Sequence, residues 1–261
     1  MTIIMPILFA GHGNPMNAIE DNAFSRTWAE VGKSLPRPRA IVCVSAHWET
    51  DGTCVTAMES PPTIHDFHGF PQQLNEMAYP ASGSPDLANR ITELVRSARI
   101  RPDRMWGLDH GAWSVLCRMF PEADIPVVQV SLDAGAPAMF HYKLGRELRP
   151  LRQEGVLVLG SGNMVHNLRL MTWTRHGFDW AVECDAAMAR LIQDGNHAAL
   201  TAYAAIPHAR KAIPSEKHYL PLLYVLGAMY PNEPVAFFNT QVTLGSVSMR
   251  GFVAGGVSQN P

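Results

Sequence analysis

The sequence has little charge, few cysteines and no long apolar run, and each shortage argues against a class of protein. Charged residues make up 17% of its 261 residues, and the formal net charge is −2. Lysine and arginine form no cluster, so we do not expect a surface that follows nucleic-acid phosphates. The most apolar later stretch, residues 218–230, is too short to span a bilayer. The expected partners are therefore neither nucleic acid nor membrane.

Cysteine usage and the first residues both favour an intracellular protein. The four cysteines are Cys43, Cys54, Cys117 and Cys184, and they form no CxxC pair. The first three lie in apolar runs. That pattern predicts reduced core residues and no disulfide framework. Pro6 and Gly11 interrupt the first apolar run, and no basic residue precedes Arg26, which is not the pattern of a signal peptide. We therefore expect a soluble cytoplasmic protein.

Several common catalytic and phosphate-binding motifs are also missing. The chain contains no GxGxxG and no GK[ST], so the glycines of "GHGN" at residues 11–14 are a weak signal for phosphate binding. It contains no GxSxG elbow either, and "GSG" at residues 160–162 lacks the context of a nucleophile. Nucleotide binding and serine hydrolysis are both disfavoured.

Short β-branched runs alternate with helical patterns along the whole chain, which predicts an α/β fold. Strands are expected at 6–10, 40–46, 53–58, 126–132, 155–161 and 234–238, and helices at 22–34, 84–99, 112–119, 138–153, 180–194 and 219–229. Several strands are apolar throughout, as in sheets covered on both faces. We expect a single three-layer α/β/α domain spanning residues 1–261, with a central mostly parallel or mixed sheet and a long loop at 59–83.

Three histidines fall where predicted strands end. His12 follows 6–10, His47 follows 40–46 and His166 follows 155–161. Because the carboxyl ends of parallel strands meet at one edge of a sheet, these imidazoles are expected to lie close together. Small or amide neighbours such as Gly11 and Gly13 would let a metal or substrate approach. The pattern predicts a metal site at this edge, and His110 and His218, which open predicted helices, are compatible with it.

Each of these histidines also has a purely structural interpretation. A single histidine beside glycine can be a hydrogen-bonded core residue, with the glycines there only to turn the chain. The metal-site hypothesis is preferred for His12 and His47 because separate strand ends repeat the pattern. His65 and His68 lie in the 59–83 loop, which could fold over the edge as a lid. The remaining histidines are expected to be structural.

Aromatic residues near these motifs could form the wall of an apolar pocket. The candidates for contact with a substrate are His65, Trp48, Phe67 and Trp113, with Phe70 beside them. Ordinary core packing is the alternative for each aromatic ring, and the sequence leaves that choice open.

Seven short motifs follow one another in order: "GHGNPMN", "SAHWET", "TIHDFHGFP", "YPASGSP", "GLDHGAW", "SGNMVHNLR" and "EKHYLPLLYVLGA". Together they resemble the class III extradiol ring-cleaving dioxygenases, most closely the bacterial branch called 4,5-DOPA extradiol dioxygenases. The resemblance runs from about residue 5 to about residue 250. It implies an α/β/α non-haem metalloprotein that opens a catechol ring with O2 and gives a semialdehyde acid.

The resemblance also implies roles for individual residues. His12 and His47 match two metal ligands, and His218 falls at the third ligand position, where wider relatives have a glutamate. His166 matches a position described both as a metal ligand and as a catalytic base. His110 matches a catalytic histidine on the substrate side.

The all-histidine ligand set leaves the identity of the metal open. Two histidines and a carboxylate are typical of Fe(II) oxygenases, whereas three histidines and a water suit Zn(II) as well. Fe(II) is expected for activity, with Zn(II) as an occupant of the same site. A zinc-dependent hydrolase and a non-catalytic metal-binding protein of the Memo type are the alternatives, and the sequence leaves a homo-oligomer open.

Overall fold

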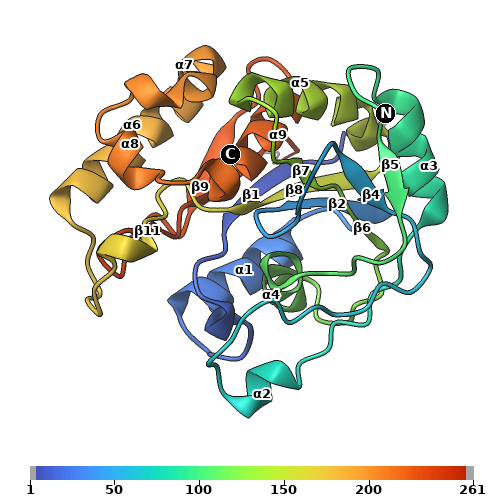
Figure 1. Cartoon of the computed structure of the whole chain (residues 1–261), viewed down its shortest axis with the longest axis horizontal. Coiled ribbons are helices and arrows are strands. Elements are labelled where there is room, and N and C mark those ends of the chain that lie inside the picture. Colours follow the sequence, from blue (N-terminus) through green and yellow to red (C-terminus); the bar gives the residue numbers. More distant parts are fainter. Residues whose placement is uncertain (1–3, 257–261) are drawn as a thin grey trace.

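The computed structural model describes residues 4–256, and a six-stranded sheet lies at its centre (Figure 1). The sheet has the order β6-β2-β8-β1-β12-β9. Its strands are β6 (Val127–Gln129), β2 (Ala40–Ser45), β8 (Val156–Gly162), β1 (Ile7–Gly11), β12 (Gly251–Ala254) and β9 (Val235–Phe238). The strands β6, β2, β8 and β1 pair in parallel, and β12 pairs antiparallel with both β1 and β9. The predicted mostly parallel sheet is confirmed.

Helices and short strands connect these six strands. The α-helices are α1 (Ala23–Ser34), α2 (Gln72–Asn75), α3 (Pro85–Leu94), α4 (His110–Met119), α5 (Ala138–Leu148), α6 (Asp179–Gln193), α7 (His197–Thr201), α8 (Ala209–Ala212) and α9 (Leu220–Ala228). The 3-10 helices are η1 (Pro15–Ala18), η2 (Arg149–Glu154), η3 (Leu168–Leu170), η4 (Tyr203–Ala205) and η5 (Glu216–His218). Two-stranded sheets join β3 (Glu49–Thr50) to β7 (Leu132–Asp133), β4 (Cys54–Thr56) to β5 (Arg101–Asp103), and β10 (Val242–Thr243) to β11 (Val247–Ser248).

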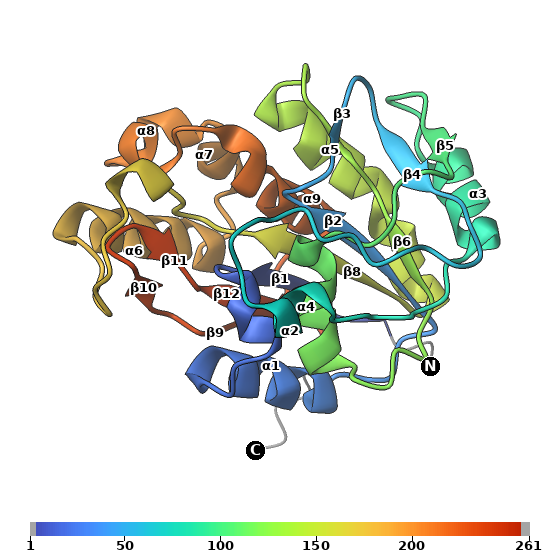
Figure 2. The same cartoon turned by 60° about the horizontal axis from the view of Figure 1, so that its bottom comes forward.

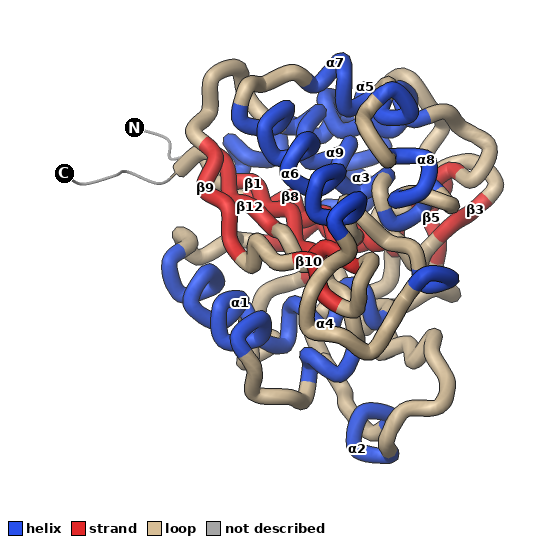
Figure 3. The backbone as a smooth tube through the Cα atoms, turned by 90° about the vertical axis from the view of Figure 1, so that its left-hand side faces the viewer, coloured by secondary structure: helices blue, strands red, loops and turns tan. Residues whose placement is uncertain are grey.

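Two separate apolar cores cover the two faces of the sheet. Alternate residues of β1 point to opposite faces, so Ile7 and Phe9 join one core and Leu8 and Ala10 join the other. The first core contains buried residues of α3, α5, α6 and α9, and the second contains those of α1 and α4. Figure 3 shows these two helix groups on either side of the strands, and Figure 2 shows α1 and α4 together on one face. The expected three-layer α/β/α arrangement is confirmed.

Several predicted boundaries differ from the structure for local reasons. The helix predicted at 112–119 begins earlier, at His110, because the Asp109 side chain accepts a hydrogen bond from the Ala112 backbone and caps it. The helix predicted at 138–153 ends at Leu148 and continues as η2, whose first turn contains Pro150, a residue that cannot donate an α-helical hydrogen bond.

Two of the differences concern strands. The strand predicted at 53–58 covers only Cys54–Thr56 and pairs with β5 outside the six-stranded sheet. Residues 251–254 form β12, which the sequence analysis did not predict, and β12 separates β1 from β9. The 59–83 loop is present and contains the single turn α2.

The described residues contain no disulfide and no helix that could cross a membrane. All four cysteines are free. Cys43, Cys54 and Cys184 are buried, whereas Cys117, which was expected in the core, is only half-buried. Within residues 4–256, none of the helices combines the length and the apolar character that a bilayer span requires.

Helix α9 packs closely against α5, and this contact requires glycine. A Cβ atom at Gly145 in α5 would clash with the carbonyl oxygen of Tyr224 in α9. Because α9 follows directly after His218, this contact also determines the position of the segment that carries the histidine.

We expect Gly145→Ala to destabilise the protein by about 1–3 kcal/mol, the usual cost of overpacking a tight contact. Gly135→Ala is the matched control, because its Cβ would meet nothing closer than an Asp133 oxygen at 3.7 Å. Urea unfolding of both variants measures the effect. Equal free energies of unfolding for the two variants would contradict the proposed role of this contact.

Candidate functional site

The register of three parallel strands brings two of the predicted histidines to one edge of the sheet. Gly11 at the end of β1 lies opposite Gly162 in β8, and Ser45 at the end of β2 lies opposite Ser161. His12 and His47 follow directly after these ends, as predicted. Helix α4 begins at the same edge, because the Ser45 hydroxyl donates to the Asp109 carboxylate at 2.6 Å.

The glycines around His12 shape the chain. A Cβ at Gly11 would lie 2.7 Å from the carbonyl carbon of Met249, and Gly13 has a positive φ of 59°. The sequence analysis expected these small neighbours to open access to His12. In the structure, Gly11 makes room for the backbone of Met249, and Gly13 turns the chain towards η1.

A third histidine arrives from a distant part of the sequence. The Asn163 backbone N–H donates to the His218 carbonyl at 2.8 Å. A Cβ at Gly162 would clash with that carbonyl oxygen, so glycine at this position lets η5 approach the end of β8. His218 thereby joins His12 and His47.

His12, His47 and His218 form a compact cluster of imidazoles. One ring nitrogen from each lies within 4.8 Å of the others, and the Nε2 atoms of His12 and His47 are 3.3 Å apart. His12 and His218 are 1% and 5% exposed. Burial, followed by the charges of neighbouring histidines, lowers the pKa of His12 and of His218 well below the ordinary value. Both rings are therefore neutral at pH 7, which is the form that binds metal ions.

Hydrogen bonds select the tautomers of two of these rings. The Ser161 hydroxyl donates to the Gly111 carbonyl, so its oxygen is left to accept from His12 Nδ1 at 3.0 Å. The Nδ1 atom of His47 lies 3.2 Å from a carboxylate oxygen of Asp66. In each ring the proton is therefore on Nδ1, and the Nε2 lone pair is directed at the cluster.

Asp66 is a site residue that the sequence analysis missed. Its other carboxylate oxygen lies 2.9 Å from His110 Nδ1 and accepts the His110 backbone N–H at 2.9 Å. Burial alone would raise the pKa of Asp66, but the hydrogen bonds from His110 and His47 hold that pKa well below its usual range. The available signal was a carboxylate in the predicted lid loop, within the motif "TIHDFHGFP".

His166 lies beside the cluster without joining it. Its ring stacks on His218, with centroids 3.6 Å apart and planes 6° apart. A histidine binds a metal through a lone pair in its ring plane, and one ion cannot lie in both of these stacked planes. Burial, followed by the charges of His47 and Lys217, lowers the pKa of His166 to about 4.

A cavity of about 590 Å³ opens above the cluster. All five histidines named for the site line it, together with Asp66. The 59–83 loop contributes Phe67, His68 and Phe70, and the segment after β8 contributes Leu168, Met171 and Trp173. Part of the 59–83 loop therefore forms one wall of the cavity. A mostly apolar cavity with a few convergent polar groups is the usual form of a small-molecule site.

Three predicted substrate-contacting residues lie outside the cavity lining. His65 Nε2 is 2.9 Å from the Met77 carbonyl. Trp113 is fully buried and donates its ring N–H to the Ile64 carbonyl, and Trp48 stacks on Trp106. His65 and Trp113 support the wall from behind, because their rings lie against Phe67 with centroids 5.7 Å and 6.2 Å from it. Of the predicted wall residues, Phe67 and Phe70 line the cavity.

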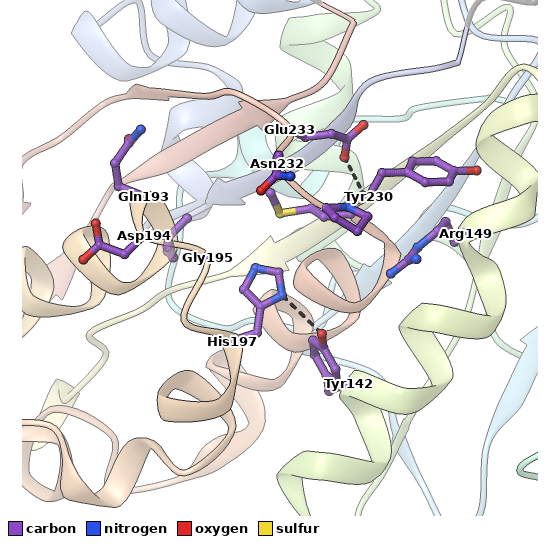
Figure 4. Close-up of a pocket in the computed structure, with 12 residues that line it drawn as sticks. Tyr142, Arg149, Gln193, Asp194, Gly195, His197, Tyr230, Asn232 and Glu233 are labelled. Atoms are coloured by element: carbon purple, nitrogen blue, oxygen red, sulfur yellow. Dashed lines mark hydrogen bonds between the residues drawn. The ribbon is translucent and has the colours of Figure 1, made fainter.

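A second cavity of about 350 Å³ lies at the other end of α9 (Figure 4). It is lined by residues that include Arg149 and His197, and the Tyr142 hydroxyl lies 3.2 Å from His197 Nδ1. The nine residues of α9 separate it from the histidine cluster by roughly 13 Å along the helix. None of the five site histidines lines it, so the first cavity is the candidate site.

Comparisons with known proteins identify the family to which this fold and sequence belong. Residues 5–248 match the family model described as the catalytic LigB subunit of aromatic ring-opening dioxygenase. The chain is 49% identical to 4,5-DOPA dioxygenase extradiol of Escherichia coli (strain K12), over 94% of this chain and 93% of that protein. It is 39% identical to the protein of the same name from Beta vulgaris, over 88% of each. A crystal structure of an uncharacterized Escherichia coli K12 protein superimposes with a TM-score of 0.84 at 43% identity, covering 96% of this chain and all of that one.

The buried histidines make the stability of the metal-free protein depend on pH. Folding lowers the pKa of His12, His218 and His166, the last to about 4, from an ordinary 6.5. The unfolded chain therefore binds more protons below pH 6.5, so stability is complete above that pH and is lost as the pH falls towards 4. Each such histidine contributes a slope of about 1.4 kcal/mol per pH unit.

Urea unfolding of EDTA-treated protein between pH 6.5 and 4.5 measures this slope. His166→Asn should show a shallower slope than the parent, because it removes one of the contributing groups. If the free energy of unfolding does not change over this range, protonation of these histidines does not destabilise the folded protein, and the prediction is wrong.

Proposed function

The chain belongs to the LigB family of aromatic ring-opening dioxygenases, and from this premise we propose that it opens the ring of a catechol with O2 beside the two hydroxyls. The product of such a cleavage is a semialdehyde acid. We further propose that residues 1–261 act as one catalytic domain whose partners are the catechol and O2. Family membership makes the protein an oxidoreductase, and the metal, the residue roles and the substrate class are the proposal.

The proposal rests on one observation: a cluster of three histidines and a candidate acid–base histidine line the same cavity. Three histidines present nitrogens within 4.8 Å of one another, and His110, linked to Asp66, lines the same space. Extradiol cleavage requires a place for the two oxygens of the diol and a group that moves their protons. Several relatives carry the name 4,5-DOPA dioxygenase extradiol, which is consistent with a catechol as substrate.

The donor set fits a single divalent cation. The Nε2 atoms of His12 and His47 lie 3.3 Å apart, an arrangement that a shared cation would stabilise. We propose that His12, His47 and His218 hold the ion, with Fe(II) active and Zn(II) able to occupy the same site. When bound, the ion supplies Lewis acidity towards the catechol oxygens and, as iron, a path for electrons to O2.

We propose His110 as the residue that takes a hydroxyl proton from the catechol. Its Nδ1 lies 2.9 Å from the Asp66 carboxylate, so Nε2 is the nitrogen that would exchange a proton with the substrate. Asp66 also stabilises the imidazolium that proton uptake creates, as an aspartate does beside a catalytic histidine. Asp66 also contacts His47. One carboxylate therefore fixes the position of His110, the proposed proton acceptor, relative to His47, a proposed metal ligand.

His166 is proposed as a second acid–base group. The stacked geometry argues against a ligand role alongside His218, and its low pKa keeps it neutral at pH 7. A neutral imidazole in the cavity wall can accept a hydrogen bond from substrate or oxygen and pass on a proton. Phe67 and Phe70 provide apolar surface for the ring and exclude water from it.

Neither alternative function has a comparable observation in its favour. A zinc-dependent hydrolase would need a general base beside a metal-bound hydroxide, and the available bases are the same histidines. A Memo-type interaction protein would favour an open surface, whereas here the cluster lies in a cavity that the 59–83 loop helps to line. Membership in a dioxygenase family weighs against both.

We expect protein loaded anaerobically with Fe(II) to consume O2 and form a yellow product when a catechol and air are added. An oxygen electrode and the visible spectrum provide two independent readouts. Protein loaded with Zn(II) is the control and should do neither, because zinc cannot exchange electrons. Absence of O2 uptake with every catechol tested would overturn the proposed function.

Substitution should separate the metal ligands from the acid–base groups. His12→Ala should abolish metal binding, whereas His110→Ala should retain the metal and lose roughly 10²–10⁴-fold in kcat. His208→Asn is a matched control, because His208 is exposed outside the cavity and has a φ of 63°, which asparagine tolerates. It should keep both metal and turnover.

Metal analysis and steady-state kinetics on the same preparations provide the measurements. Full turnover in His110→Ala would remove that residue from the mechanism. Normal metal content in His12→Ala would show that the ion lies elsewhere.

A further inference from the structure

The three consecutive residues of η5 have three different surroundings. Glu216 accepts a hydrogen bond from the Tyr203 hydroxyl outside the cavity, and His218 joins the histidine cluster. Between them, Lys217 is half-buried and lines the cavity. The same short helix therefore delivers a proposed metal ligand and a cation to one space.

The charge of Lys217 has no partner in the described structure. Among residues 4–256, no carboxylate lies within ion-pair distance of its ammonium group, whereas each of the ten ion pairs found there uses other residues. Asp66 is the one carboxylate of the cavity lining, and it is shared by His47 and His110. An unpaired cation beside an apolar wall favours an anion, because less water is there to screen it.

The rest of the lining offers no competing charge. Phe67, Phe70, Leu168, Met171 and Trp173 line the same cavity and carry no charge. A ligand bound above the cluster therefore experiences one free positive charge from the protein.

We propose that Lys217 binds an anionic substituent of the substrate, so that the cavity selects catechols with a carboxylate side chain over neutral or cationic ones. This inference rests on the proposed function, because it assumes that a catechol binds with its diol at the histidine cluster. The substituent then points away from the cluster and meets the ammonium group. Lys217 is thus a residue of substrate specificity, with no part in the proton transfers.

A series of catechols that differ only in charge tests this assignment. Dihydrocaffeate, propylcatechol and dopamine have side chains of similar length that carry a negative, no and a positive charge at pH 7. For the Fe(II)-loaded parent protein we expect kcat/KM to fall in that order. In Lys217→Met the ratio of kcat/KM for dihydrocaffeate to that for propylcatechol should fall about ten- to a hundredfold, the usual loss of a charged contact.

Two further variants sharpen the test. Lys217→Arg keeps the charge and should retain most of the ratio. Lys211→Met is the matched control, because Lys211 lies over the Trp180 ring at 4.5 Å and does not line the cavity; its ratio should equal that of the parent. Thermal unfolding confirms that each variant is folded, and a ratio of two substrates is insensitive to partial loss of active protein.

The outcomes separate this inference from the proposed function. If no catechol is opened by the parent protein, the proposed function fails. If propylcatechol is opened but the parent shows no preference for dihydrocaffeate, or Lys217→Met retains that preference, the role of Lys217 is wrong while the proposed function stands. An equal loss in Lys211→Met and Lys217→Met would likewise overturn the inference, because it would show a general effect of surface charge.

Discussion

The register of the parallel strands β2, β8 and β1 is the constraint on which the site depends. Because side chains alternate along a strand, a slip of one residue would turn every residue of that strand to the opposite face. In the observed register, Ser161 of β8 lies beside both neighbouring strand ends, where its hydroxyl binds His12 and the start of α4. The same register places Ser45 against Asp109, which caps α4 at His110. One pairing pattern thus positions imidazoles from three separate parts of the chain.

This arrangement is costly to build, and the fold around it compensates for the cost. Burying neutral imidazoles whose lone pairs face one another contributes little to stability. It also removes the hydrogen bonds that each ring would make with water, which disfavours folding. The two apolar cores on either side of the sheet supply the stabilisation. The hydroxyl of Ser161 and the carboxylate of Asp66 then restrict the rings to one tautomer. A site that is preorganised in this way would not have to rearrange on binding the proposed ion.

The sequence was informative where local pattern determines position, and it failed where tertiary packing does. His12 and His47 were predicted together because a strand end is a local feature and parallel strands share an edge. His218 could be assigned only by resemblance, since its approach depends on the contact of its backbone with Gly162. Asp66 was missed because nothing in a long loop indicates which of its residues faces inward.

The aromatic residues and β12 show the same limit. Trp48 and Trp113 stand beside site motifs, yet a ring next to a motif can point to either side of it. Strand β12 is four residues long, begins with glycine and pairs antiparallel between β1 and β9, so its hydrophobic pattern is too short to recognise without its partners. In both cases the position depends on which distant segment packs against these residues, and a local sequence pattern does not contain that information.

The position of the carboxylate has a consequence for how charge is divided within the site. In a ligand set of two histidines and a carboxylate, the acid would reduce the charge of a bound divalent ion to 1+. Here the carboxylate, Asp66, stands behind His47 and His110, so three neutral ligands would leave the full 2+ charge for a doubly deprotonated catechol to balance. With the diol end neutralised in this way, the remaining uncompensated charge of the lining is that of Lys217. The histidine cluster would then act on the reacting oxygens, and Lys217 on the substituent.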